Sequence, residues 1–284
     1  MTYSLQANGV FTPDVPVVHR EEEYDSHGFD LIREMQGRHF WYLGRHRFLL
    51  GALKVELQRR SSATNNLNAI DLGGGCGGWI KYLRERSPQT FSELALSDSS
   101  LRALELAQAT VGDAVSRYQV DLLSLGWENR WDVAFLLDVL EHIPKDAETL
   151  HQIKQALRPD GLLFVTTPAI QGFWSYNDEL AHHVRRYAKQ DFRRLAETTG
   201  LKLLRANYFM FFLSPLLWPS RLNRPNLERM SAEELHELMR RTHRVPPEPF
   251  NGLLRFIFEL ETPLGLKLPF PWGTSILGVF QKPG

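Results

Sequence analysis

The chain has 284 residues, of which 43% are hydrophobic and 23% are charged. This length suits one large α/β domain with an elaboration, or two small domains. The 33 Lys and Arg residues balance the 33 Asp and Glu residues, so no net charge favours binding to nucleic acid, and no nucleic-acid partner is expected.

The cysteine content and the apolar runs indicate a cytoplasmic protein. The single cysteine, Cys76, excludes an internal disulfide and is typical of a reducing compartment. Residues 1–20 lack the pattern of a secretory signal. The longest apolar run, at 208–218, is interrupted by Ser214 and Pro215 and is too short to cross a bilayer, so no transmembrane segment is expected.

Residues 1–60 predict an irregular arm over 1–20 and then a helical cap, because apolar residues recur at helical spacing from about residue 25. Residues 61–284 predict one larger domain in which short apolar strands alternate with helices. Strands are expected at 67–72, 93–97, 117–120, 131–137 and 162–166, and helices at 79–86, 100–111 and 147–157. This alternation predicts an α/β fold with a doubly wound, Rossmann-like sheet.

The C-terminal part is less regular. It predicts a helix at 189–199, a strand at 201–209 and a final strand at 273–281, which brings the sheet to seven strands with the last one antiparallel. The stretch of about 213–271, rich in proline and apolar residues, predicts a helical lid insertion. Its apolar content could serve a small core of the lid, a substrate pocket, an oligomer interface or a shallow membrane contact.

The stretch 71–78 (DLGGGCGG) connects a buried strand to a helix. Glycines there allow a sharp turn and a close approach to a ligand. The spacing G-x-G-x-x-G, starting at Gly73, is typical of dinucleotide binding. However, Asp71 with Gly73, Gly75 and Gly77 resembles motif I of class I S-adenosylmethionine (SAM) methyltransferases. Asp71 favours SAM, because a carboxylate can contact the methionine ammonium but would repel a pyrophosphate.

Residues at the ends of the next two strands continue this resemblance. Asp98, followed by Ser99, lies where an acid that binds the ribose belongs, and its alternative role is to cap the next helix. Asp121 and Leu122, after the third strand, match the place where the family reads the adenine. The alternative for Asp121 is an ordinary turn residue.

The fourth strand ends in 138–142 (DVLEH) and is followed by 157–168 (LRPDGLLFVTTP). Both segments resemble the subgroup that includes the ubiquinone-biosynthesis O-methyltransferases, with the mild departure that Asp160 stands where many relatives have glycine. The resemblance implies SAM as the cofactor, with Asp138 near its methionine end. Arg45, in an aromatic segment that resembles the one covering SAM, could pair with the methionine carboxylate or lie on a helix surface.

Three histidines are candidate general bases for a hydroxyl acceptor: His142, after the fourth strand, and His182 and His183, after the fifth. Each could instead have a structural role. A metal site is a further alternative, because Asp138, Glu141, His142 and His182 resemble the ligand set of small-RNA 2′-O-methyltransferases.

The sequence therefore predicts a SAM-dependent methyltransferase that acts on a small-molecule or lipid-like acceptor in a biosynthetic pathway. Oxygen is the expected acceptor atom, and nitrogen and carbon are the alternatives. Two other functions stay open: an NAD-dependent oxidoreductase that uses the other glycine spacing, and a SAM-binding subunit without catalysis. The oligomeric state and a peripheral membrane contact also stay open.

Overall fold

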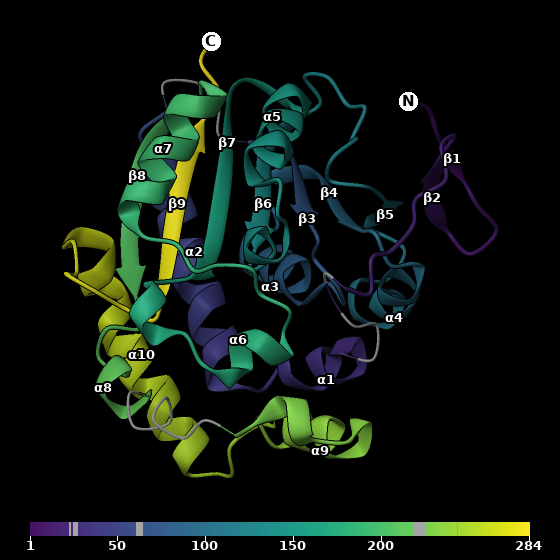
Figure 1. Cartoon of the computed structure of the whole chain (residues 1–284). Coiled ribbons are helices and arrows are strands. Elements are labelled where there is room, and N and C mark those ends of the chain that lie inside the picture. Colours follow the sequence, from purple (N-terminus) through teal and green to yellow (C-terminus); the bar gives the residue numbers. More distant parts are fainter. Residues whose placement is uncertain (23, 25–27, 61–64, 218–224, 243) are drawn as a thin grey trace.

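The computed structural model describes the whole chain except residues 23, 25–27, 61–64, 218–224 and 243. The described strands form one mixed sheet with helices on both faces (Figure 1). The strands are β1 (Tyr3–Leu5), β2 (Val10–Pro13), β3 (Leu67–Leu72), β4 (Phe91–Asp98), β5 (Ser116–Gln119), β6 (Trp131–Leu137), β7 (Leu157–Pro168), β8 (Lys202–Phe209) and β9 (Ser275–Gln281).

The helices fall into a set before the sheet, a set between the strands and a set in the C-terminal insertion. They are α1 (Gly28–Met35), α2 (Phe40–Gln58), α3 (Gly78–Arg86), α4 (Leu101–Val111), α5 (Asp146–Ala156), α6 (Tyr176–Leu180), α7 (Lys189–Thr199), α8 (Ser214–Leu217), α9 (Ala232–Thr242) and α10 (Phe250–Lys267). Within the described part of the chain, no helix combines the length and apolar content needed to cross a membrane.

The Rossmann-like α/β fold is confirmed, and the strand order is β1-β2-β5-β4-β3-β6-β7-β9-β8. Strands β3 to β7 run parallel, and β9 is antiparallel to both β7 and β8, as expected for the last strand. Successive residues of the central strands enter different cores: Ala69 and Phe135 pack with α2 and α3, whereas Ile70 and Leu136 pack with α5 and α7. This alternation explains why the parallel strands are continuously apolar.

The described sheet has nine strands rather than the seven expected, because the N-terminal arm is partly ordered. Strands β1 and β2 form an antiparallel hairpin, and β2 extends the sheet in parallel beside β5. The turn contains Asn8 and Gly9, and Gly9 has a φ of 74°. An Asn-Gly pair is a strong hairpin signal. The prediction of an irregular arm over 1–20 is therefore wrong for these two strands.

The predicted insertion is helical, and its longest helix, α10, packs along α2. Gly44 of α2 permits this contact, because a Cβ atom there would lie 2.0 Å from the Phe258 side chain. Phe258 is buried and stacks on Phe209, which in turn stacks on Phe48. α10 is therefore continuous with the core on the α2 side of the sheet. It does not form a separate core of the insertion.

Candidate active site

A cavity of about 180 Å³ lies where β3, β4, β5 and β6 end, and α1, α2 and the N-terminal arm complete its wall. One water molecule needs only roughly 10–15 Å³, so this space suits an organic ligand. Nine of the ten predicted cofactor-binding residues line it: Arg45, Asp71, Gly73, Gly75, Asp98, Ser99, Asp121, Leu122 and Asp138.

The tenth residue, Gly77, has a packing role. It precedes the first residue of α3 with a φ of 79°, and a Cβ atom there would lie 2.5 Å from Val111 of α4. Gly73, by contrast, lines the cavity, and a Cβ atom there would lie 2.7 Å from Val139. The glycine loop thus needs Gly73 for the turn beside the cavity and Gly77 for the contact between two helices.

Asp71, the last but one residue of β3, is a buried acid with one carboxyl oxygen that accepts no hydrogen bond from the described residues. Its side chain is 1% exposed, and this oxygen is Oδ1. Burial raises the pKa of Asp71 to about 7, although the nearby Arg45 guanidinium opposes the shift. A buried carboxyl with an open oxygen is a favourable partner for a cationic donor on a ligand.

Asp98 holds two backbone segments at the mouth of the cavity. Its Oδ2 accepts from the Gly75 N–H at 3.0 Å, and its Oδ1 accepts from the Ser100 N–H at 3.0 Å. Burial raises the pKa of Asp98, and the backbone N–H groups oppose this shift. The residue that caps α4 is Ser100, whose Oγ accepts from the Ala103 N–H at 3.3 Å. The alternative that Asp98 caps this helix is therefore wrong.

Arg45 is buried in α2 and pairs with Asp138, which also accepts a hydrogen bond from Thr166 at 3.0 Å. Its guanidinium carbon lies 4.8 Å from the ring centre of Trp41 and 5.2 Å from that of Tyr42. The guanidinium thus makes cation–π contacts in addition to its ion pair. The alternative of a surface arginine is wrong, and the pairing with Asp138 was not predicted.

Two further residues of the cavity wall, His19 and Arg20, come from the N-terminal arm. The His19 Nδ1 lies 2.8 Å from the Ser99 hydroxyl, and Arg20 donates to the Asp121 carboxylate at 2.8 Å. The arm is thus tied to two residues that were predicted to bind the cofactor. The sequence contained no signal for these contacts, because they join positions 80 and 101 residues apart.

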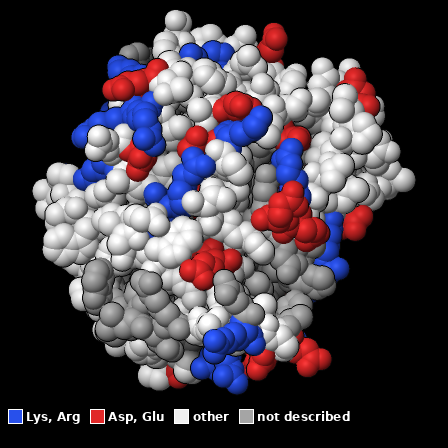
Figure 2. All heavy atoms as spheres, in the orientation of Figure 1, with Lys and Arg blue, Asp and Glu red and all other residues white. Residues whose placement is uncertain are grey.

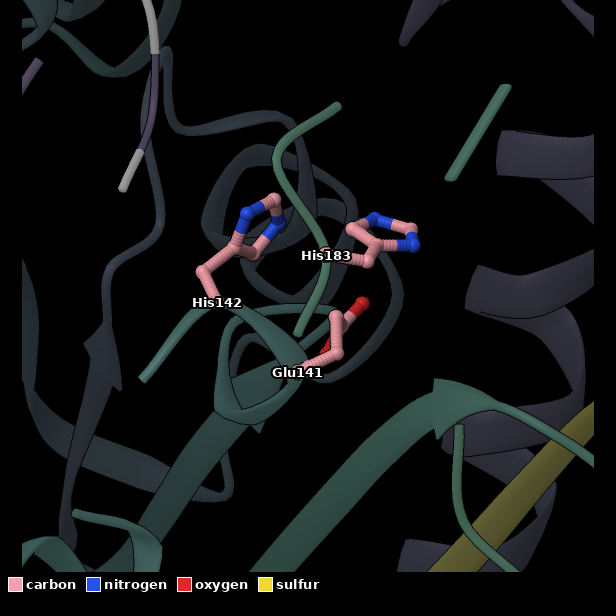
Figure 3. Close-up of side chains that lie close together, drawn as sticks. All are labelled: Glu141, His142 and His183. Atoms are coloured by element: carbon pink, nitrogen blue, oxygen red, sulfur yellow. The ribbon is translucent and has the colours of Figure 1, made fainter. Parts of the chain in front are cut away.

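Of the three predicted histidines, His142 and His183 lie together and His182 does not. His142 lines the cavity, and its ring centre lies 4.7 Å from that of His183. Figure 3 shows both rings next to Glu141, and one ligand atom from each of the three residues lies within 4.8 Å of the others. His182 is exposed and lies outside this cluster. The structure therefore replaces His182 with His183 in the predicted metal set, and Asp138 pairs with Arg45 instead.

Glu141 is fully buried, and neither of its carboxyl oxygens has a hydrogen-bond partner among the described residues. Burial raises its pKa well above the ordinary value, and the nearby Asp138 carboxylate adds to this shift. A carboxyl in this state holds a proton or takes a cation, because an unpartnered buried charge is costly.

Asp178, which the sequence analysis missed, holds His183 in place. Its Oδ1 lies 3.0 Å from the His183 Nδ1 and accepts from the Arg186 Nε at 2.7 Å. Burial alone would raise the pKa of Asp178, but the hydrogen bonds from His183 and Arg186 lower it to about 2. This ionised carboxylate favours a proton on Nδ1 and leaves Nε2 as the acceptor or ligand atom of His183.

Comparisons with known proteins identify the family of the chain. The methyltransferase domain family matches residues 43–206. The ubiquinone biosynthesis O-methyltransferase of Hydrogenovibrio crunogenus is 24% identical over 123 residues, which are 42% of this chain and 49% of that protein. The protein of the same name from Leptothrix cholodnii is 24% identical over 106 residues, or 36% and 45% of the two chains. The chain thus spans about half the length of these curated relatives.

Among solved structures, the phosphoethanolamine N-methyltransferase 2 of Haemonchus contortus in complex with SAM is similar, with a TM-score of 0.57. The alignment covers 91% of this chain and 57% of the other at 14% identity, so it supports the fold alone. The family match covers more than half of the chain and favours SAM over NAD. The chain therefore belongs to the methyltransferase domain family, whose methyl donor is S-adenosylmethionine.

Proposed function

We propose that this chain transfers the methyl group of SAM to an oxygen of a small-molecule or lipid-like acceptor in a biosynthetic pathway. The observation that carries the proposal is the cluster of Glu141, His142 and His183, because His142 belongs both to this cluster and to the cofactor cavity. A hydroxyl acceptor must lose its proton on methylation, and such a cluster can accept it. The two curated relatives, which are named O-methyltransferases, add weak support.

The residues around the cavity fit the cofactor. Asp71 has an open buried oxygen for the methionine ammonium, and the Asp98 carboxylate has further acceptor capacity for the ribose hydroxyls. Asp121 and Leu122 would lie beside the adenine. When bound, the cofactor supplies an electrophilic methyl group, so the work of the chain is to position the acceptor and remove its proton.

His142 and His183 would have different roles in the removal of the acceptor proton. His142 would accept the proton, since it is the member of the cluster that lines the cavity. His183, oriented by Asp178, would stabilise the charge that forms on the neighbouring imidazole or share the proton. Glu141 and the two imidazoles would also suit a divalent cation, which would lower the pKa of a bound hydroxyl.

The test is the rate of methyl transfer in His142→Gln and His183→Gln, measured as S-adenosylhomocysteine (SAH) release with a panel of phenolic acceptors. Both variants should lose roughly 10²- to 10⁴-fold in turnover and keep their SAH affinity. His182→Gln is the matched control, because it changes an exposed histidine one position away, and it should remain active.

Three outcomes separate the alternatives. If both variants keep the normal rate, the assignment of oxygen with a histidine base is wrong, and nitrogen or carbon becomes the acceptor atom. If EDTA abolishes activity and a divalent metal restores it, the same cluster is a metal site. If SAH binds tightly but no acceptor is methylated by the unmodified chain, the protein is a SAM-binding subunit.

A further inference from the structure

Helix α10 has an exposed apolar stripe on the side that faces away from α2. The stripe consists of Leu253, Phe256, Leu260 and Leu264, and each of these residues is between 43% and 55% exposed. Their spacing of three or four residues places them on one side of the helix. The opposite side, which includes the buried Phe258, packs on the core. The stripe is thus not needed for the packing of α10.

Other large apolar side chains are exposed at both ends of the helix and in the segments around it. They are Phe212, Leu216, Phe250, Leu268 and Trp272, all at least 39% exposed. Along the left margin of Figure 2, where the C-terminal half of α10 lies in Figure 1, the side chains are mainly uncharged, whereas Lys and Arg gather over α7. So many large exposed apolar residues near one helix indicate a contact surface.

Among the described residues, the unpaired charges on the exposed part of α10 are cationic. Arg255 and Lys267 are exposed, whereas Glu259 is half-buried and pairs with Arg47. Glu261 is buried and accepts from the Phe212 N–H at 2.8 Å.

Just before the helix, Glu248 accepts from the Asn251 side-chain amide and from the Gly252 N–H. Glu248, Glu259 and Glu261 therefore all have partners within the chain. The exposed part of α10 combines apolar side chains with positive charge.

We propose that α10 docks on the surface of an anionic phospholipid bilayer, with the stripe in the interfacial region and Arg255 and Lys267 at the level of the headgroups. A helix with Phe and Leu on one side and flanking cations has the chemistry of an interfacial helix. A second copy of the chain fits less well. A two-fold contact between antiparallel α10 helices would bring Arg255 of one copy near Lys267 of the other, and the partly exposed acid of α10, Glu259, is already paired with Arg47.

The proposed membrane surface is connected to the wall of the cofactor cavity. At the start of α10, the Asn251 Oδ1 accepts from the Phe40 N–H at 3.0 Å, and its Nδ2 donates to the Arg38 carbonyl at 3.0 Å. The next two residues, Trp41 and Tyr42, line the cavity. A bilayer beneath α10 would therefore lie close to the segment that closes the site, which suits an acceptor drawn from the membrane.

The test is co-sedimentation of the full chain with vesicles of phosphatidylcholine, with and without phosphatidylglycerol. The chain should bind the mixed vesicles more tightly, and added salt should weaken this binding. The double variant Phe256→Ser/Leu260→Ser should lower the partition coefficient by about tenfold or more on both vesicles. Arg255→Glu/Lys267→Glu should remove the preference for phosphatidylglycerol and leave the weaker binding to phosphatidylcholine.

Leu5→Ser is the matched control, because it removes a 62% exposed apolar side chain from β1, on the opposite side of the molecule from α10 (Figure 1). It should bind vesicles like the unmodified chain. The proposal is overturned if the unmodified chain binds neither vesicle. It is also overturned if sedimentation velocity shows a dimer that the Phe256→Ser/Leu260→Ser change dissociates. Vesicle binding is measured without cofactor or acceptor, so its failure is distinct from a failure of O-methylation.

Discussion

Lowering the pH from about 8 to about 6 should weaken the binding of SAH, because Asp71 must be ionised to contact the methionine ammonium. The pKa of this buried carboxyl is raised to about 7 in the ligand-free chain. About nine-tenths of the molecules carry the carboxylate at pH 8, and about one-tenth carry it at pH 6. If only this form binds the ammonium, the association constant falls about tenfold, or about 1.4 kcal/mol.

Titration calorimetry with SAH across this pH range measures the effect. Asp71→Asn should bind SAH more weakly at pH 8 and show no pH dependence of this origin. Asp113→Asn, which neutralises an exposed acid outside the cavity, should keep the slope of the unmodified chain. The reasoning fails if the affinity of the unmodified chain is constant with pH, or if Asp71→Asn shows the same tenfold change.

Three further predictions concern Asp178 and Arg20, the residues that the structure added to the site. In Asp178→Asn, turnover should fall by about tenfold or more with SAH affinity unchanged, because the side chain that orients His183 is lost. The pKa of Asp178 is lowered to about 2 in the folded chain, so its ionised carboxylate stabilises the fold by about 2 kcal/mol at pH values above its unfolded pKa. Chemical denaturation should show that the unmodified chain loses this extra stability over Asp178→Asn as the pH falls from about 4 to about 2. Arg20→Ala removes a half-exposed ion pair worth less than about 1 kcal/mol, so stopped-flow measurements should show SAH leaving about two- to fivefold faster at an unchanged Tm. An unchanged dissociation rate would mean that the arm does not hold the cofactor.

The central sheet and the cavity were predictable because their signals are local. The glycine loop follows β3, Asp98 ends β4 and Asp121 comes shortly after β5, and the carboxyl ends of parallel strands meet at one edge of the sheet. Nine of the ten predicted cofactor residues could therefore be brought to the cavity without knowledge of long-range packing. The Asn8-Gly9 hairpin was equally local, and it was missed because its two strands are too short to show alternation.

The sequence could not show that His183, and not His182, joins the cluster with Glu141 and His142, because this depends on the conformation of one loop. His182 adopts a φ of 57° and is exposed, while the next residue contacts Asp178. Asp178 is held in turn by the capping box at the start of α6, where it accepts from the Ser175 N–H. Likewise, no sequence pattern pairs Arg45 with Asp138, since the two residues are 93 positions apart.

The most direct test of this account is a crystal structure of the chain with SAH bound. The account predicts that both ribose hydroxyls donate to the Asp98 carboxylate, that the methionine ammonium contacts Asp71 directly or through one water, and that the adenine lies beside Asp121 and Leu122. SAH bound outside this cavity, or bound within it without contact to Asp98 and Asp71, would contradict the assignment of the site.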